Sequence, residues 1–432
     1  MKKSVWTDTV SLPQFKNLNK DIKTDVLIIG GGMCGILCAY FFKKAGIPYV
    51  LAEANNIACG ITKNTTAKIT SQHGLIYSKI NKQYGKEKAH MYLDINQKAL
   101  HEYEKLCRNI DCNYENKDAY TYSTDNRAKI EEEVRVLKNM GFDASFEKDT
   151  ELPFQIDGAV KFKNQAQFHP LKFIAEIAKE LNIYENTAIR ELTPDCAITD
   201  NAKIYAKQII VTTHFPFINK HGSYYLKLYQ HRSYVSSYEN AVLLNGMYVD
   251  ENKKGMSLRS FDNLLLIGGG GHRTGKQSPA WNEIHEFSKK YYPHSTLRYE
   301  WATQDCMSLD SIPYIGHYSK NTPNMYVATG FNKWGMTSSM AAAIILTDMI
   351  CGKNNDFAEI FSPQRSIIKP QLLINSFEAT VNLVTPTTKR CPHLGCALKW
   401  NNAEHTWDCP CHGSRFEKEG KLIDNPATGN IK

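Results

Sequence analysis

Six residues of metal-ligand type stand close together near the end of the chain. They lie in two boxes, Cys391-Pro392-His393-Leu394-Gly395-Cys396 and Cys409-Pro410-Cys411-His412-Gly413-Ser414. The first box pairs a cysteine with a histidine as Cys-x-His, and the second pairs them as Cys-x-x-His. Two thiolates and two imidazoles suit either zinc or a mixed-ligand iron–sulfur centre. Zinc fingers usually pair Cys with Cys and His with His, which this order does not do.

A second group with chemical potential lies near the start of the chain. The apolar run 25–29 predicts a buried parallel strand and leads into Gly30-Gly31-Gly32-Met33-Cys34-Gly35. A helical pattern, a second strand at 49–52 and Glu53 follow. In such a unit Gly30 allows the tight turn, Gly32 lets backbone approach a pyrophosphate, and Gly35 lets the helix pack on the strand. Glu53 is placed to accept from ribose hydroxyls, so the stretch predicts dinucleotide binding.

The rest of the chain must position these two groups. Periodicity predicts helices at 82–108, 126–140, 170–181 and 338–350. It predicts strands at 119–123, 159–162, 183–184, 187–189, 204–212 and 325–330. Residues 223–320 alternate in the manner of a mainly antiparallel sheet. Residues 352–370 resemble a linker, and short strands and turns are expected in the last sixty residues.

Composition excludes several classes of protein. The 432 residues are 42% hydrophobic and 22% charged, as in a globular protein with room for two or three domains. No apolar run reaches the roughly 18 residues of a membrane span. The start lacks the apolar core of a signal peptide, which favours the cytosol. The net charge of +8 is spread along the chain and favours solubility over nucleic-acid binding.

The two cysteine boxes resemble those of the Rieske [2Fe–2S] proteins. The resemblance implies that Cys391 and Cys409 bind one iron while His393 and His412 bind the other. It also implies a disulfide between Cys396 and Cys411, as in the cytochrome-bc type. In high-potential members a serine and a tyrosine donate to cluster sulfurs. Here the serine is Ser414, but the tyrosine position holds Phe416, so a lower potential is expected.

The remainder resembles the glycine and D-amino-acid oxidases and dehydrogenases, over roughly residues 20–355. The motifs that carry this resemblance, in order, are 30–53, 168–170, 209–213, 301–316 and 330–337. The whole chain then resembles the DadA-like dehydrogenases with a C-terminal Rieske domain. This implies a Rossmann-like α/β flavin domain of the glutathione-reductase type, an interleaved α+β antiparallel substrate domain, and a small all-β Rieske domain. The expected boundaries are an oxidoreductase at 1–355 (flavin parts about 20–80, 165–215 and 320–355; substrate parts 81–164 and 216–319), a linker at 356–370 and the Rieske domain at 371–432.

The resemblance implies FAD as the dinucleotide. Beyond the glycine turn and Glu53, the residues expected near FAD are Thr65, Thr66, Lys68, Ala188, Thr212, Gly330, Trp334, Gly335, Met336 and Thr337. A second helix N-terminus, after Gly330, would stabilise negative charge on the reduced flavin ring. Two alternatives stay open: residues 60–74 could form an ordinary polar loop, and Trp334 could be a core aromatic.

One departure from the oxidases concerns the substrate. Those enzymes carry a Trp-x-x-x-Arg-Pro-x-x-x-Asp-x-x-Pro run whose Arg clamps a substrate carboxylate. Here the ungapped run begins at Trp301 and has Asp305 at the Arg position. An acid cannot form that clamp, so an α-amino acid substrate is doubtful. Arg232 or Arg273 could replace it, and His73 could act as a base or be a structural histidine.

The sequence therefore predicts a cytosolic FAD-dependent oxidoreductase, a dehydrogenase in preference to an oxidase. A small amine-like or related substrate would lose a hydride to FAD, and electrons would pass singly to the [2Fe–2S] centre and on to an external carrier. The opposite direction of flow stays open. The alternatives are a redox-sensing or electron-carrier flavoprotein without turnover, and an oxidase with a structural zinc module. Neither a nucleic-acid partner nor a membrane span is expected.

Overall fold

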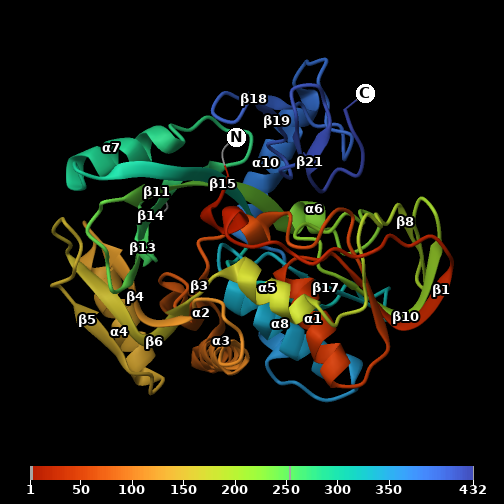
Figure 1. The fold of residues 1–432 in the computed structure, drawn as a ribbon, viewed down its shortest axis with the longest axis horizontal. Coiled ribbons are helices and arrows are strands. Elements are labelled where there is room, and N and C mark those ends of the chain that lie inside the picture. Colours follow the sequence, from red (N-terminus) through yellow and green to blue (C-terminus); the bar gives the residue numbers. More distant parts are fainter. Residues whose placement is uncertain (1–2, 253, 432) are drawn as a thin grey trace.

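The computed structural model describes residues 3–252 and 254–431, and its core is built on two large sheets and one small one (Figure 1). In the first sheet, buried apolar strands pair in parallel around β1, as the sequence predicts for a dinucleotide-binding unit. Across this sheet the strand order is β16 (Tyr314–His317), β17 (Met325–Thr329), β10 (Lys203–Val211), β1 (Ile22–Ile29), β2 (Tyr49–Ala52) and β7 (Ile183–Tyr184), with β8 (Glu191–Leu192) and β9 (Cys196–Ile198) attached to β10.

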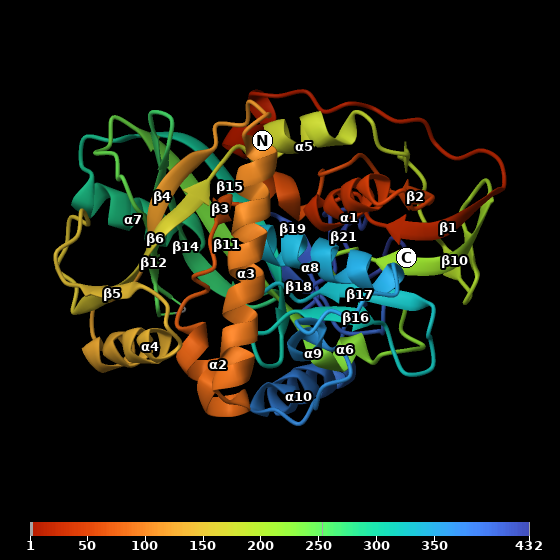
Figure 2. The same cartoon turned by 90° about the horizontal axis from the view of Figure 1, so that it is seen from below.

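Helices cover the first sheet, and the small residues of α1 and α8 allow these two helices to pack closely together. In the view of Figure 2, α8 lies beside α1, and the long α3 crosses their ends. Gly85, with φ +87°, separates α2 from α3, so the helix predicted from residue 82 begins at Lys86. The helices of this region are α1 (Met33–Lys44), α2 (Ile76–Tyr84), α3 (Lys86–Cys107), α5 (Pro170–Ala178) and α8 (Gly335–Ile350), with short 3₁₀ turns η1 (Val5–Asp8) and η2 (Ile61–Asn64).

The second sheet is mainly antiparallel, and its strands come from two separate parts of the chain. Its order is β15 (Thr296–Ser308), β11 (Leu228–Glu239), β14 (Leu264–Arg273), β13 (Ser257–Phe261), β12 (Met247–Asp250), β4 (Glu115–Ser123), β6 (Gly158–Gln167) and β3 (Lys68–Ile69), with β5 (Ala144–Glu147) on β6. Only the β12–β4 pair is parallel among the described strand pairs of this sheet. The helices packed with it are α4 (Arg127–Asn139), α6 (Tyr224–Lys227) and α7 (Trp281–Tyr291).

The C-terminal part is a helix and a small antiparallel sheet that lie against one end of the second sheet (Figure 1). Its elements are α10 (Pro370–Val384), β18 (Lys399–Asn401), β19 (Thr406–Asp408), β20 (Arg415–Phe416) and β21 (Leu422–Asp424). The predicted α/β unit with a parallel sheet, the antiparallel sheet and the small β-rich C-terminal unit are all present. Within the described residues, no helix combines the length and the apolar content that crossing a membrane requires.

Four local predictions differ from the structure. Residues 187–189 form no strand, because the Thr187 amide bonds the Glu53 carbonyl and its hydroxyl bonds the Glu185 carbonyl, outside any ladder. Helix α7 interrupts the region predicted to be strands. Helix α10 fills the start of the segment predicted to hold only short strands and turns, and α9 (Ala358–Phe361) lies in the predicted linker.

Candidate functional site

The glycine turn lies between β1 and α1 and is held from two sides. Gly30 has φ +109°, and a Cβ there would lie 2.9 Å from the carbonyl oxygen of Thr212. A Cβ on Gly35 would lie 1.9 Å from the carbonyl oxygen of Gly30, so the helix can approach the strand only with glycine at this position. Glu53 accepts from the amides of Gly31 (2.6 Å) and Asn55 (2.9 Å), and burial raises the pKa of its carboxyl.

A cavity of about 1680 Å³ runs from this turn towards the second sheet. A Cβ on Gly32 would meet only the Thr62 hydroxyl, at 3.4 Å, so this turn leaves space where an elongated ligand can approach the backbone. The residues present therefore fit a dinucleotide. The residues of the FAD prediction that line the cavity are Gly30, Gly32, Glu53, Thr65, Thr66, Lys68, Ala188, Thr212, Trp334, Gly335 and Met336. Gly35, Gly330 and Thr337 lie behind this lining.

His73 and Trp334 stack at the start of α8, with ring centroids 5.0 Å apart. The Nε2 atom of His73 lies 2.9 Å from both the carbonyl oxygen of Thr70 and the hydroxyl of Thr337, whose own proton goes to the same carbonyl. Nε2 therefore donates, and Nδ1 accepts from the Tyr92 hydroxyl at 2.7 Å. Burial lowers the pKa of His73 to about 3. Both nitrogens are in use, which supports the structural interpretation of His73 over the catalytic one.

Lys68 lies on the segment 60–74, which the sequence places near the flavin, together with Lys63. Its ammonium donates to the Thr66 hydroxyl at 3.3 Å, and both residues line the cavity. Burial, and then the charge of Arg259, lower the pKa of Lys68 to about 7. A negative charge placed in the cavity, such as a bound phosphate or a reduced flavin ring, would therefore stabilise the protonated form of Lys68.

Asp305 lies on β15, on the wall of the cavity formed by the second sheet. Burial raises the pKa of its carboxyl to about 6, and the charges of Lys333 and Arg232 act in the opposite direction. Trp301, four residues earlier on the same strand, donates through its indole to the carbonyl oxygen of Asn64 at 2.9 Å. Trp301 and Asp305 are four residues apart on one strand, so their side chains lie on the same face of the sheet. Asp305 therefore faces the segment 60–74 that contains Asn64.

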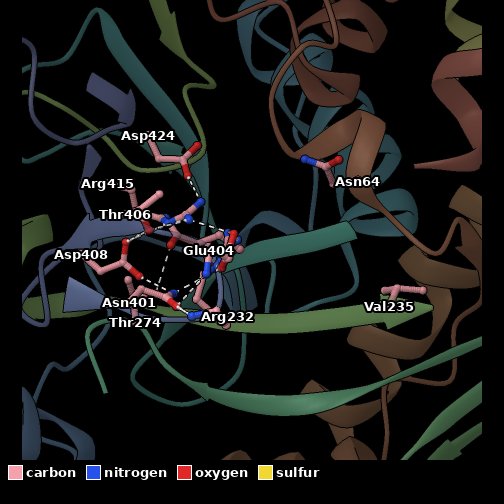
Figure 3. Close-up of polar contacts among 12 residues, drawn as sticks. Asn64, Arg232, Val235, Thr274, Asn401, Glu404, Thr406, Asp408, Arg415 and Asp424 are labelled. Carbon is pink, nitrogen blue, oxygen red and sulfur yellow. Dashed lines mark hydrogen bonds and ion pairs between the residues drawn. The ribbon is translucent and has the colours of Figure 1, made fainter. Parts of the chain in front are cut away.

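Arg232 belongs instead to an ion-pair network at the C-terminal unit (Figure 3). Its guanidinium is 3% exposed and binds both carboxylate oxygens of Glu404. Glu404 also binds Arg415, which in turn pairs with Asp408 and Asp424. Arg232 is thus occupied by a carboxylate of the chain itself, which argues against it as a substrate clamp.

Arg273 also binds the C-terminal unit. It donates to the carbonyl oxygens of Pro410 (3.1 Å) and Cys411 (3.3 Å) and to the side chain of Asn375 (2.9 Å). Asp305, Arg232 and Arg273 all line the cavity, but both arginines are also bound to the C-terminal unit, which argues against either as a substrate clamp.

The four predicted cluster ligands come together in the C-terminal unit. The Nδ1 atoms of His393 and His412 are buried and have no hydrogen-bond partner, and their rings are 4.9 Å apart. Cys391 and Cys409 are within sulfur hydrogen-bond distance, and this contact lowers the pKa of the Cys391 thiol to about 7. Two orphaned imidazole nitrogens and two adjacent thiols fit the two irons of a Rieske centre.

The remaining two cysteines of the boxes form the disulfide Cys396–Cys411, with Cα atoms 6.7 Å apart. The pairing implied by the resemblance is therefore confirmed. Ser414 donates to the Cys391 thiol, and Phe416 is fully buried in the small core beneath the cluster loops. Position 416 therefore offers no hydroxyl to the cluster sulfurs, in agreement with the lower reduction potential of the cluster expected from the sequence.

The outward edges of the two histidines contact the rest of the chain. Nε2 of His393 lies 2.8 Å from Oδ1 of Asn219, and Nε2 of His412 lies 3.0 Å from the carbonyl oxygen of Tyr225. Since both partners accept, both Nε2 atoms donate, which leaves Nδ1 for the metal. Sequence reasoning missed Asn219 and Tyr225, and their types and spacing carry no signal that could have found them.

The chain matches two family descriptions. Residues 25–349 match "FAD dependent oxidoreductase" (DAO), and residues 371–432 match "Rieske [2Fe-2S] domain". A Rieske 2Fe-2S iron-sulfur protein of Bacillus subtilis, YhfW, is 34% identical over 490 aligned positions that cover 99% of this chain and 96% of the relative. The cytochrome b6-f complex iron-sulfur subunit of Nostoc punctiforme is 51% identical over 37 residues, which are 9% of this chain and 21% of the subunit.

Solved structures share the larger fold. Glycine oxidase from Geobacillus kaustophilus superposes with a TM-score of 0.68 at 16% identity, covering 80% of this chain and 99% of the oxidase. L-proline dehydrogenase from P. horikoshii gives 0.67 at 15% identity, covering 80% and 98%. The DAO and Rieske matches identify the cofactors as FAD and a [2Fe–2S] cluster, and the zinc alternative is set aside.

Proposed function

The chain belongs to the FAD-dependent oxidoreductases of the DAO family and ends in a Rieske [2Fe–2S] domain, and from this premise we propose that it is a dehydrogenase for a small amine-like substrate. Electrons would leave one at a time through the cluster to an external carrier. When bound, FAD supplies two-electron hydride chemistry and the cluster supplies one-electron transfer.

The observation that carries this proposal is the contact between the cluster histidines and the oxidoreductase part. The Nε2–H groups of His393 and His412 donate to Asn219 and Tyr225, on the segment that follows β10. That segment begins at Thr212, which lines the FAD cavity. Both acceptors lie within ten residues of the expected end of the flavin part at 215, which suits electron transfer within the chain and disfavours an isolated electron-carrier module.

The chain's own groups fit the remaining tasks. The glycine turn and Glu53 hold the dinucleotide, and Lys68 and the start of α8 favour negative charge at its far end. Asp305 repels an anionic substrate and so favours a cationic or neutral one. The eight cysteines outside the two boxes are free, as a reducing cytosol favours.

The test is an anaerobic screen of the purified holoprotein with amines, amino acids and hydroxy acids. An active compound should bleach the flavin absorbance, and the reduced-cluster electron-paramagnetic signal should rise in the same experiment. Bleaching without a cluster signal would refute electron transfer to the cluster. Reduction of the flavin only by a reduced external carrier, with no compound active, would show the opposite direction of flow.

A further inference from the structure

Helix α10 exposes its apolar side and buries its polar side. Asn375 and Asn382 are the buried residues of the helix, at 5% and 3% exposure. Leu373, Phe377 and Val384 are 75%, 68% and 74% exposed. At about 100° per residue, the exposed apolar residues 373, 374, 377, 381 and 384 fall within an arc of about 100°, and a sixth, Leu383 (46% exposed), lies about 80° beyond its edge. This is the reverse of a helix that packs on its own domain.

The buried asparagines show why the helix is held in this orientation. Asn375 accepts from Arg273 at 2.9 Å and donates to the carbonyl oxygen of Leu226 at 3.3 Å. The backbone carbonyl oxygen of Asn382 accepts from the amide of Ala397, just after the first cluster box, while its side-chain amide donates to the carbonyl oxygen of Glu378 within the helix. The polar side is thus fixed by specific hydrogen bonds, so the apolar side faces outward in the folded chain.

The exposed stripe continues beyond the helix. Ile368, before α10, is 86% exposed, and Leu394, within the first cluster box, is 39% exposed. Contiguous apolar surface of this kind marks an interaction site. It lies on a single convex helix, and the cavity lining includes only Gln371 and Ile374 of that helix. A convex stripe without a groove suits insertion into a lipid surface.

The charges beside the stripe are basic. Lys369 precedes the helix, and Lys389 and Arg390 follow it. The only acidic side chain on α10 is Glu378, which is 14% exposed and paired with Lys276. An apolar stripe flanked by cations is complementary to an anionic membrane surface.

We propose that α10 docks the chain on an anionic lipid membrane surface by inserting the stripe of Leu373, Phe377, Val381 and Val384, with Lys369, Lys389 and Arg390 at the headgroups. The helix is 15 residues long, so it lies along the surface and does not cross. Ile374, at one edge of the stripe, also lines the cavity, but the docking is argued from the exposed apolar surface and its charges and does not rest on the substrate proposal.

The experiment is co-sedimentation of the holoprotein with vesicles of phosphatidylcholine alone and of phosphatidylcholine with one quarter phosphatidylglycerol. Wild type should bind the anionic vesicles more tightly. The double variant Leu373→Ser, Phe377→Ser should reduce partition into them by about tenfold or more. A matched control is Val242→Ser, Leu243→Ser, on the loop after β11, where both residues are also exposed (74% and 44%) and should not matter.

Flavin and cluster absorbance report whether each variant is folded. Lys369→Glu, Lys389→Glu should remove the preference for anionic vesicles without loss of either cofactor; Arg390 is left in place because it donates to the carbonyl oxygen of Gly395 in the first cluster box. Absence of wild-type binding to both vesicles, or equal binding of wild type and the α10 variant, overturns the proposal. So does a dimer in solution that the α10 substitutions dissociate, because the stripe would then be an interface between copies of the chain.

Discussion

Gln304 and Asp305 are neighbours on β15 and both line the cavity, and Gln304 also binds the cluster loop. The side-chain amide of Gln304 donates to the carbonyl oxygen of Gly413 at 2.9 Å, next to the ligand His412. Its carbonyl accepts from the Thr274 hydroxyl at 3.1 Å. Strand β15 therefore contacts both the cavity and the cluster loop.

Gln304→Leu should slow electron transfer between flavin and cluster, because the Gly413 carbonyl loses its donor and the cluster loop loses a fixed position. A slowing of about tenfold or more is expected, since a buried unsatisfied carbonyl costs about 1–3 kcal/mol. The measurement is the rise of reduced-cluster absorbance after flash reduction of the flavin. Gln277→Ala, which removes an exposed hydrogen bond to Trp400, is the control. Equal rates in wild type and Gln304→Leu would contradict this role.

Arg232 is expected to stabilise the docking of the Rieske domain. Arg232→Met leaves the Glu404 carboxylate with Arg415 alone. Breaking a buried ion pair costs about 3–5 kcal/mol, and the remaining partner should keep the loss in free energy of unfolding near the lower end. Denaturant unfolding measures it. Arg190→Met, at an exposed pair with Asp200, should cost less than about 1 kcal/mol. If Arg232→Met kept full stability but lost binding of an active carboxylate, Arg232 would be the clamp after all.

The parts of this arrangement that can be predicted from the sequence are those whose residues lie close together along the chain. The turn at Gly30–Gly35 and the two cysteine boxes are local patterns, and each predicted its own part of the site. The docking residues Asn219, Gln304 and Glu404 lie on three segments far apart in the chain, and only the fold brings them together. Helix α10 was missed because apolar residues there were expected to enter short strands, whereas its buried side consists of asparagines.

Gly32→Val should fold but lose FAD. A Cβ at this position meets only the Thr62 hydroxyl, at 3.4 Å, so the added side chain extends into the cavity where the dinucleotide must approach. Flavin absorbance per protein should fall by about tenfold or more, while the cluster spectrum remains. Gly35→Ala serves as the contrast, because its Cβ would lie 1.9 Å from the Gly30 carbonyl oxygen and should destabilise the fold itself. Full flavin in purified Gly32→Val would refute the assignment.

His73 should contribute to stability and not to the pH dependence of catalysis. Its pKa is lowered to about 3, below the usual value near 6.5, so the unfolded chain binds more protons between these values and stability should rise with pH across that window. His73→Phe leaves the Tyr92 hydroxyl unpaired and should cost about 1–3 kcal/mol. The pH profile of flavin reduction by an active substrate should be the same in wild type and in His73→Phe. A step near pH 6.5 that is present in wild type and absent from the variant would identify His73 as a base.

Asp305 should decide the charge of the substrate. Burial raises its pKa to about 6, so the folded chain binds more protons than the unfolded chain between pH 4 and 6, and this group's contribution to stability falls as pH rises through that window. Above pH 6 the carboxylate is charged, and two unit charges at about 4 Å interact by several kcal/mol at an effective dielectric of about 20. Binding of a cationic substrate should therefore strengthen as pH rises through about 6.

The matched variants are Asp305→Asn and Asp305→Arg. Asp305→Asn should weaken flavin reduction by a cationic substrate by about tenfold or more and abolish its dependence on pH near 6, whereas Asp305→Arg should admit carboxylates. Anaerobic flavin reduction with an amine and with glycine or D-alanine measures both. Efficient reduction of the wild-type flavin by glycine or D-alanine would contradict this role. Since Arg232 and Arg273 are both held by the Rieske domain, a clamp would then have to come from Lys68 or from release of one of those arginines.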